Sequence, residues 1–401
     1  MKNKISNWKL RNLFYFTSII IILPMTGCRE NTNMLCQGHY QTEEEALIQL
    51  ERFKTEYQDL EGWNVKAKKI RKGILYGSGL TTYPEKCELK PIIGERKDMD
   101  GYSVENIAFE CLPGFWVTGN LYRPDSLSAE KIPGILCPHG HWKDPEDYGR
   151  FREDMQRRCA AFARMGAMVF TWDMVGYGES TQVGHDYEYA LALQLWGSIR
   201  SVDFLLTIPE VDKDRLCITG ASGGGTQTFL LAAVDDRIDL SIPVVMVSAH
   251  FFGGCNCESG MPIHKSQNHE TNNVEIAALA APRPMLLVSD GDDWTKNTPS
   301  VEYPYIEDIY DFYGKGDNLS YAHFPDEKHD YGLSKRMAVY PFLAKHFNMD
   351  ISSISNENDE VDEGFVKILP YNELRVFSKN VQRPDYAVSE DEITGLLFDN
   401  R

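Results

Sequence analysis

The sequence predicts an α/β fold, with a doubly wound, mostly parallel sheet and helices on both faces. After Pro133, short apolar stretches of strand length alternate with longer amphipathic stretches of helix length. This alternation is typical of a parallel sheet whose strands are joined by helices. A second observation is the segment Gly220-Ala221-Ser222-Gly223-Gly224, which lies between an apolar run and a helix-like stretch. Since ligands of such sheets bind beyond the carboxyl ends of the strands, the residues that follow each strand are the functional candidates.

The first 28 residues have the pattern of a bacterial lipoprotein signal. Four basic residues precede an apolar run over 13–23, and small residues then lead to Cys28. The apolar run is shorter than the roughly 20 residues that a membrane-spanning helix needs. We therefore expect 1–27 to be a signal peptide and Cys28 to carry lipid. This lipid would be the only attachment to the membrane, on the periplasmic or the outer face of the cell envelope.

The chain is acidic, with 401 residues and a formal net charge of −18. The predicted signal peptide contains four basic and no acidic residues, so its removal would change the net charge to −22. Because binding to phosphate backbones requires clustered Lys and Arg, we expect no nucleic-acid partner.

Residues 28–100 are expected to form a helical preface, because apolar side chains recur at helical spacing between positions 40 and 70. Two alternating stretches, 102–109 and 115–122, are predicted to pair as an antiparallel hairpin. A catalytic domain is predicted over 101–349, followed by a C-terminal extension over 350–401. Within the domain we expect strands over 134–138, 167–172, 216–219, 240–247, 285–289 and 319–324, and helices over 154–165, 189–206, 226–234, 302–313 and 334–346.

Ser222 is the candidate nucleophile. Small residues two positions before and after it allow a sharp strand-to-helix turn that exposes the hydroxyl above the sheet. The alternative is a Gly-rich turn in which Ser222 is only a helix N-cap. The flanking strand and helix favour the nucleophile, as does the presence of an Asp and a His downstream in the order that a catalytic triad requires.

The predicted base is His329, which follows the last predicted strand and precedes the last predicted helix. The acid that orients it is expected on the loop after strand 285–289, where Asp293 is preferred to Asp292 because it lies farther beyond the strand end. Glu258 and Glu302 are further alternatives for the acid. Together these residues would supply the nucleophile, base and orienting acid of an ester hydrolase.

The predicted oxyanion hole consists of the backbone N–H groups of His141 and Gly223. His141 follows a strand and a His-Gly pair, and Gly223 follows the nucleophile. The walls of the substrate pocket are expected to come from loops after the strands. These loops supply the candidate substrate-binding residues Trp142, Tyr177, Phe251, Phe252, Glu258 and Trp294.

Cys255 and Cys257 form a C-x-C within the Gly-rich loop 251–260. A metal site is conceivable there, but the sequence shows no second pair of ligands at zinc-like spacing, and His139 with His141 is a weak motif. We therefore predict a disulfide or a stiffened loop, with no metal and no cofactor. Asp173, after another strand, is expected to pin a loop.

The chain resembles a family of exported bacterial α/β-hydrolases described as acetylxylan-esterase-like. The likeness runs from about 101 to 347 and is carried by blocks at 113–122, 137–142, 220–225, 253–258 and 293–299. It implies an α/β-hydrolase fold, a Ser-His-Asp triad and the removal of acyl groups from plant polysaccharides. Related lipoproteins include methyl esterases that act on pectic uronates.

The first functional hypothesis is therefore a serine carbohydrate esterase, with deacetylation placed slightly above uronate demethylation. A serine peptidase is less favoured, because peptidases of this fold usually carry a propeller or helical cap and no segment of propeller length is seen. A non-catalytic glycan-binding lipoprotein would not need the serine turn and the histidine together.

Overall fold

The computed structural model describes residues 41–144 and 147–398. The predicted signal peptide and the lipidation candidate Cys28 lie outside the described residues. Within the described ranges, no helix has the length and apolar character needed to cross a membrane.

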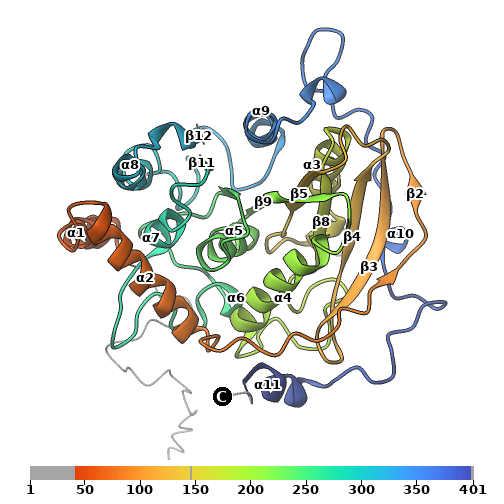
Figure 1. Ribbon diagram of the computed structural model, residues 1–401, viewed down its shortest axis with the longest axis horizontal. Coiled ribbons are helices and arrows are strands. Elements are labelled where there is room, and N and C mark those ends of the chain that lie inside the picture. The colour runs from red at the N-terminus through yellow and green to blue at the C-terminus, as the bar shows by residue number, and fades with distance from the viewer. Residues whose placement is uncertain (1–40, 145–146, 399–401) are drawn as a thin grey trace, which may run out of the picture. The chain divides into compact units, whose positions relative to one another are not determined.

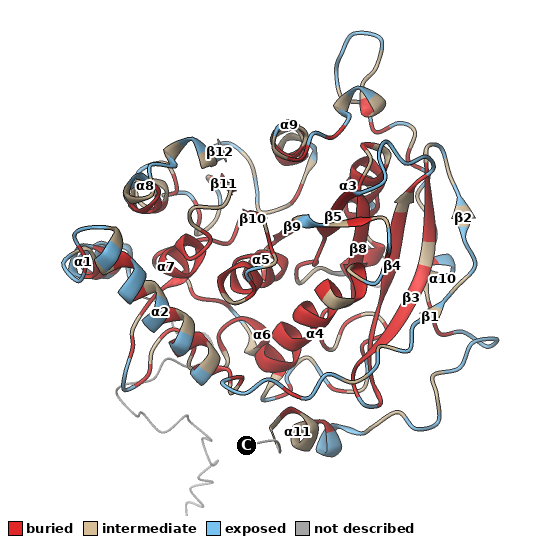
Figure 2. Cartoon of the chain, viewed as in Figure 1, coloured by how far each residue is buried: buried red, intermediate tan, exposed pale blue. Residues whose placement is uncertain are grey.

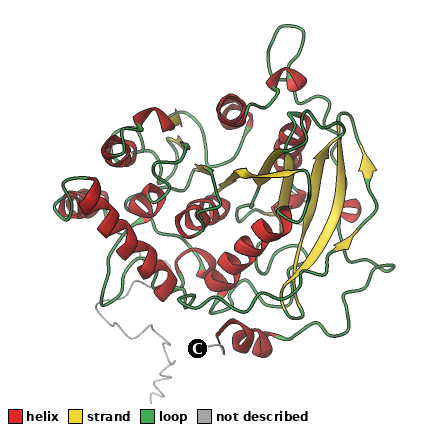
Figure 3. Ribbon diagram, viewed as in Figure 1, coloured by secondary structure: helices red, strands yellow, loops and turns green. Residues whose placement is uncertain are grey.

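One large mixed sheet forms the centre of the described chain (Figure 1, Figure 3). Its strand order is β1-β3-β4-β8-β5-β9-β10-β11-β12, with β2 paired to β3. All neighbours from β8 to β12 are parallel, whereas β1, β2, β3 and β4 form an antiparallel edge. The strands are β1 Ile92–Ile93, β2 Lys97–Asp98, β3 Tyr102–Leu112, β4 Phe115–Pro124, β5 Ile132–Leu136, β8 Met168–Trp172, β9 Val211–Ala221, β10 Leu240–Val244, β11 Met285–Asp290 and β12 Leu319–Phe324; β6 Lys143–Asp144 and β7 Asp147–Tyr148 form a separate pair.

Helices cover both faces of the sheet. The strands alternate their side chains between two apolar clusters: Leu216 and Ile218 of β9 face one cluster and Cys217 the other. The longer helices packed in the first cluster are α1 Glu43–Lys54, α2 Leu60–Gly77, α4 Ala190–Leu205, α5 Gly223–Val234 and α8 Glu302–Phe312, together with the shorter α7 Asn273–Ala278. Those in the second cluster are α3 Glu153–Arg164 and α9 Leu333–Phe347. The remaining short elements are α6 Asn256–Ser259, α10 Tyr371–Leu374, α11 Glu390–Phe398 and the 3₁₀ turns Gly149–Phe151, Gly316–Asn318 and Ile351–Ile354. Of these, α6, α10 and α11 also contribute side chains to the two clusters.

The predicted architecture is confirmed: every expected strand and helix of the 101–349 region is present, with ends shifted by a few residues. The central helices α4 and α5 are buried, whereas α1 and α2 expose their outer faces (Figure 2). The helical preface expected from the spacing between 40 and 70 consists of α1 and α2. Both begin at side-chain caps, a capping box of Thr42 with Glu45 and an N-cap at Asp59. The described part of the preface after α2 contains only two short strands, β1 and β2, and both pair with β3.

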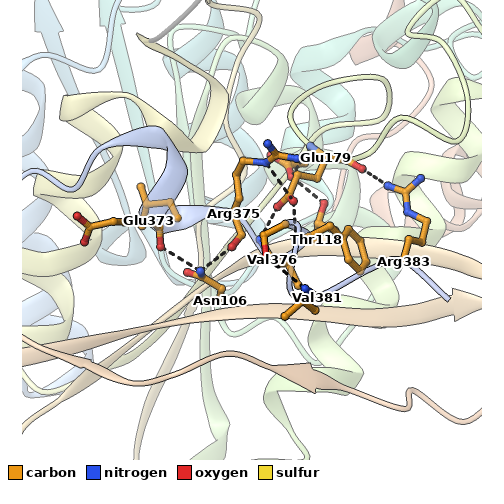
Figure 4. Close-up of polar contacts among 12 residues, drawn as sticks. Asn106, Thr118, Glu179, Glu373, Arg375, Val376, Val381 and Arg383 are labelled. Atoms are coloured by element: carbon orange, nitrogen blue, oxygen red, sulfur yellow. Dashed lines mark hydrogen bonds and ion pairs between the residues drawn. The ribbon is translucent and has the colours of Figure 1, made fainter.

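The segment after residue 350 returns to the antiparallel edge of the sheet. Asn106 of β3 donates to the carbonyls of Glu373 and Arg375 at 3.0 and 2.7 Å. The buried carboxylate of Glu179 accepts from the backbone N–H groups of Val376 and Phe377, both at 2.7 Å (Figure 4). The extension is therefore held against the sheet by buried hydrogen bonds, which its polar sequence did not indicate.

Candidate active site

The candidate catalytic residues follow three parallel strands. Ser222 comes directly after β9, Asp293 lies on the loop after β11, and His329 lies on the loop between β12 and α9. Because β9, β10, β11 and β12 are consecutive parallel neighbours, their carboxyl ends meet at one edge of the sheet. The fold thus brings all three residues to the edge where such sheets bind ligands.

Ser222 has a strained backbone, with φ 56° and ψ −124°. A non-glycine residue in this region costs about 1–3 kcal/mol, which is characteristic of functional turns. The turn leaves no room for side chains at two neighbouring positions. A Cβ atom on Gly220 or on Gly224 would lie 2.5 Å from the carbonyl oxygen of Pro138. The glycines of the motif are therefore required by the close approach of the β5 loop to the turn.

His329 forms a hydrogen bond with Asp293, with 2.5 Å between Nδ1 and Oδ2. The other carboxylate oxygen of Asp293 accepts from the backbone N–H and the hydroxyl of Thr295, both at 2.6 Å. Asp293 is almost completely buried, whereas the His329 side chain is 25% exposed. The carboxylate is therefore fixed on one side and holds the imidazole on the other, while the imidazole remains accessible.

The other candidate acids lie elsewhere. Asp292 is exposed, and its backbone N–H donates to Asp290 at 3.3 Å. Glu302 is buried and accepts the N–H of Ala249 at 3.0 Å. Glu258 is buried in the cysteine loop, where it accepts the N–H of Gly254 at 2.7 Å. The structure places only Asp293, of the four candidates, in a hydrogen bond to His329.

Asp290, at the end of β11, is an acidic residue close to Asp293 that was not among the candidates from the sequence. It is buried, and Lys335 Nζ lies 3.4 Å from its Oδ2. Burial, and then the nearby charge of Asp293, raise the pKa of Asp290 to about 6. A pKa in this range makes the local charge beside the Asp293–His329 pair depend on pH.

Three of the predicted pocket aromatics gather around His329. The ring centroids of Trp294 and His329 are 4.7 Å apart, and those of Trp142 and His329 are 6.3 Å apart. Phe251 stacks on Trp294 at 4.1 Å. All three are partly exposed, so they form an aromatic surface beside the candidate base.

The other predicted pocket residues are placed differently. Phe252 is buried against His264, with ring centroids 4.8 Å apart, and Tyr177 is buried against His141. Glu258 is also buried, and its burial raises its pKa to about 7. These three side chains support the loops of the site and present little surface to a substrate in this conformation.

The residues of the predicted oxyanion hole lie beside the serine turn. Gly223 is the first residue of α5, so its N–H is at a helix N-terminus, where backbone donors are unpaired. A Cβ atom on Gly223 would lie 2.4 Å from Cε1 of His141, so the imidazole of His141 packs directly on this glycine. The assignment of the two N–H groups as oxyanion donors stays a prediction.

The cysteine loop differs from the expectation. The sulfur atoms of Cys255 and Cys257 are 3.1 Å apart and both thiols are free. Of the two expected alternatives, a disulfide or a stiffened loop, the disulfide is therefore not formed. Two histidines that sequence spacing did not connect to this pair lie close to it: His141 Nε2 is 3.1 Å from each sulfur, and His185 Nε2 is 3.8 Å from that of Cys257. Spacing alone could not reveal this, since the two histidines come from other loops.

Two other residues singled out in the sequence have structural contacts. His139 is buried, contacts the carbonyl of Gly140 through Nδ1 and accepts the N–H of Met174 through Nε2. Asp173 accepts from Thr118 at 2.7 Å and pairs with the buried Arg150 at 2.9 Å. Asp173 thus pins its loop, as the sequence predicted.

Known proteins similar to this chain were found only among solved structures. No family model and no curated protein matches it. Among solved structures it is similar to methylesterase BT1017, with 38% identity, a TM-score of 0.83, and coverage of 91% of this chain and 81% of that chain.

More distant neighbours share the fold. A protein provisionally assigned as an acetyl xylan esterase, from Bacteroides fragilis, has 17% identity and a TM-score of 0.53 over 73% of this chain and 84% of that chain. A CE15 glucuronoyl esterase from Teredinibacter turnerae has 15% identity and a TM-score of 0.53 over 72% of this chain and 86% of that chain.

These neighbours and the sheet topology confirm the α/β-hydrolase fold. Since the similarity to methylesterase BT1017 extends over most of both chains, this chain belongs to the same family of carboxylic ester hydrolases.

Proposed function

We propose that this protein hydrolyses methyl esters of polysaccharide uronates, with Ser222 as nucleophile, His329 as base and Asp293 as the acid that orients it. The observation that carries the triad is the 2.5 Å bond between His329 and Asp293 at the sheet edge that also holds the strained Ser222. The reaction is supported by 38% identity to a methylesterase. This similarity supports placing demethylation first, whereas the sequence placed deacetylation slightly above it.

In the proposed reaction, the bond from Asp293 to Nδ1 leaves Nε2 of His329 to accept the proton of Ser222. The serine oxygen attacks the ester carbonyl, and methanol leaves with the proton from His329. Water then attacks the acyl-enzyme by the same route and releases the uronate. The N–H groups of Gly223 and His141 would stabilise the developing oxyanion, at about 3 kcal/mol for each donor.

The aromatic surface of Trp142, Trp294 and Phe251 supports a sugar substrate. Partly exposed rings beside the base provide flat apolar surfaces that match the faces of pyranose rings. Such contacts would hold the polysaccharide while the ester enters the site.

The test is to measure methanol release from methyl-esterified polygalacturonan and acetate release from acetylated xylan under the same conditions. Methanol release should be the faster by at least about tenfold, and Ser222→Ala should eliminate it. Faster acetate release would restore the deacetylase assignment, and release of neither product would refute esterase action on these glycans.

We also propose that Cys28 carries the lipid that anchors the mature chain, a proposal that rests on the sequence of residues 1–28 alone. Cys28→Ala should move the protein from washed membranes to the soluble fraction without changing its specific activity. Retention of the variant in the membranes would require a different anchor.

A further inference from the structure

We propose that His141, His185, Cys255 and Cys257 form a binding site for one divalent transition-metal ion with a preference for thiolates, of which zinc fits best. Each of the four side chains offers one ligand atom, and these atoms all lie within 4.8 Å of one another. Two thiols and two imidazoles are a ligand set that structural zinc sites use. Soft sulfur ligands also disfavour magnesium and calcium.

The distances match a small tetrahedral shell. His141 Nε2 is 3.1 Å from the sulfur of Cys255 and 3.1 Å from that of Cys257, and the two sulfurs are 3.1 Å apart. His185 Nε2 is 3.8 Å from the sulfur of Cys257. A tetrahedral zinc ion with ordinary bond lengths needs about 3.3–3.8 Å between its ligand atoms. The two sulfurs would have to separate by about 0.7 Å to complete the shell, and all four ligand atoms already lie within 4.8 Å of one another.

The ligands come from three separate loops. His141 follows β5, His185 lies between β8 and α4, and the cysteines follow β10 at the start of α6. Local chain geometry alone therefore cannot account for their convergence. The cysteine pair supplies two ligands from one turn, and each histidine is brought in by the fold.

Each histidine also has a polar neighbour at Nδ1, the ring nitrogen that would not bind the metal. Nδ1 of His185 lies 2.7 Å from the carbonyl oxygen of Val175, which can only accept, so Nδ1 must carry the proton. The lone pair of Nε2 is then directed to the sulfurs. Nδ1 of His141 lies 3.7 Å from the buried carboxylate of Glu258. Ligating histidines commonly donate a hydrogen bond through the second ring nitrogen, which fixes the tautomer and the orientation of the ring. His185 makes this bond, whereas the 3.7 Å contact of His141 is longer than a hydrogen bond.

The site would be structural, because four protein ligands fill a tetrahedral shell and leave no position for water or substrate. The position of the site beside the serine turn indicates which loop a bound metal would stabilise. The ring of His141 packs on Gly223, the residue after Ser222. A metal bound to His141 would therefore fix the loop whose backbone N–H is predicted to point into the oxyanion hole. This role rests on the proposed function, whereas the binding of metal does not.

The competing arrangement is a disulfide between Cys255 and Cys257. A disulfide requires about 2.05 Å between the sulfurs, and the observed separation is 3.1 Å. It would also consume both thiols and leave the two histidines without metal-binding partners. The intact mass distinguishes the two states, because the disulfide lacks two hydrogen atoms.

The experiment is to purify the full chain without chelators and to measure bound metals by mass spectrometry. We expect about one zinc ion per chain, and less than about a tenth of an ion in the variant that combines Cys255→Ser with Cys257→Ser. Cys87→Ser is the matched control: Cys87 is a partly buried free cysteine outside the cluster, and this variant should keep the metal. His185→Gln provides a milder variant in case the double substitution prevents folding, and it should weaken zinc binding by at least tenfold.

Cobalt provides a second measurement on the unmodified protein. After removal of zinc, added Co²⁺ should give the absorption of thiolate-to-metal charge transfer and of a tetrahedral ion, and both should be absent from the double variant. A chain that is isolated without metal and takes up neither zinc nor cobalt would overturn the proposal. An intact Cys255–Cys257 disulfide in that protein would identify the competing arrangement. None of these readouts depends on which ester the enzyme hydrolyses.

Discussion

Two groups of titratable side chains gather on the loops after the strands, and they are built in opposite ways. The Asp293–His329 pair joins two loops through one hydrogen bond, and the imidazole remains a quarter exposed. The group of His141, His185, Cys255 and Cys257 joins three loops, and its four ligand atoms face one another. The first arrangement leaves one imidazole nitrogen available to a substrate, as proton transfer requires. The second directs its polar atoms inward, as metal binding requires.

The difference indicates how each group should respond to substitution. Removing a residue that transfers a proton or forms a bond stops the reaction while the fold persists. Removing a residue that positions a loop changes the geometry of the site by a smaller amount and also lowers stability. The predictions below test this separation, from the largest expected effect to the smallest.

The largest effect is expected from Ser222→Ala and from His329→Ala. Each should lower kcat on p-nitrophenyl acetate by about 10⁴–10⁶-fold, because the two residues act as one chemical unit. The melting temperature should stay within a few degrees of the unmodified protein. His346→Ala, in the last turn of α9, is the matched control and should keep its activity. More than a trace of activity in either triad variant would show that the assignment is wrong.

Asp293→Asn should lower kcat by about 10²–10⁴-fold, since the amide favours the wrong tautomer of His329. Asp292→Asn provides a close control, because Asp292 is adjacent and exposed. It should change kcat by less than about twofold. A larger loss at Asp292, or at Glu258→Gln, would move the acid role to that residue.

The sequence predicted the pair better than the cluster, for a physical reason. Once β9, β11 and β12 are recognised as parallel strands, the topology fixes where their following loops lie. Position alone then selects Ser222 and His329 as candidates and limits the acid candidates to a few carboxylates. The choice between Asp292 and Asp293 depends on which side chain the turn directs inward. The hydrogen bonds that Thr295 donates to Asp293 show which of the two side chains this turn directs inward.

His185 could not be found in the same way. It lies in a turn-rich segment between β8 and α4, which has neither strand nor helix periodicity, and nothing links its position to that of Cys255. The C-terminal extension was obscure for a similar reason. It is held by the buried carboxylate of Glu179, a residue far away in the chain. A local signal did exist for α11, because Ser389 and Glu392 have the spacing of a capping box.

An intermediate effect is expected when both cysteines of the cluster are replaced. Cys255→Ser with Cys257→Ser should lower kcat on p-nitrophenyl acetate by about 10–100-fold and lower the melting temperature. The loss should be larger on methyl-esterified polygalacturonan, because a long substrate depends on more of the loop surface. Cys87→Ser should leave both rates unchanged. If the double variant were as inactive as Ser222→Ala on the small ester, the cluster would have to act on the ester itself.

The smallest effect concerns Glu302, a carboxylate of the same region that does not contact His329. Burial raises its pKa to about 7, from about 4.3 in an unfolded chain. The folded state therefore binds this proton more tightly than the unfolded state. The contribution of this tighter proton binding to the free energy of unfolding is fully present below about pH 4 and is lost as the pH rises through 7.

Glu302→Gln cannot ionise, and its amide oxygen can still accept the N–H of Ala249. Its free energy of unfolding should therefore gain about 2 kcal/mol relative to the unmodified protein between pH 5 and pH 8. Urea denaturation at both pH values measures this gain, and the exposed Glu44→Gln should show none. The variant should keep its turnover, because Glu302 holds Ala249 and leaves the imidazole to Asp293. A loss of kcat comparable to that of Asp293→Asn, with no change in the pH dependence of stability, would reverse the two assignments.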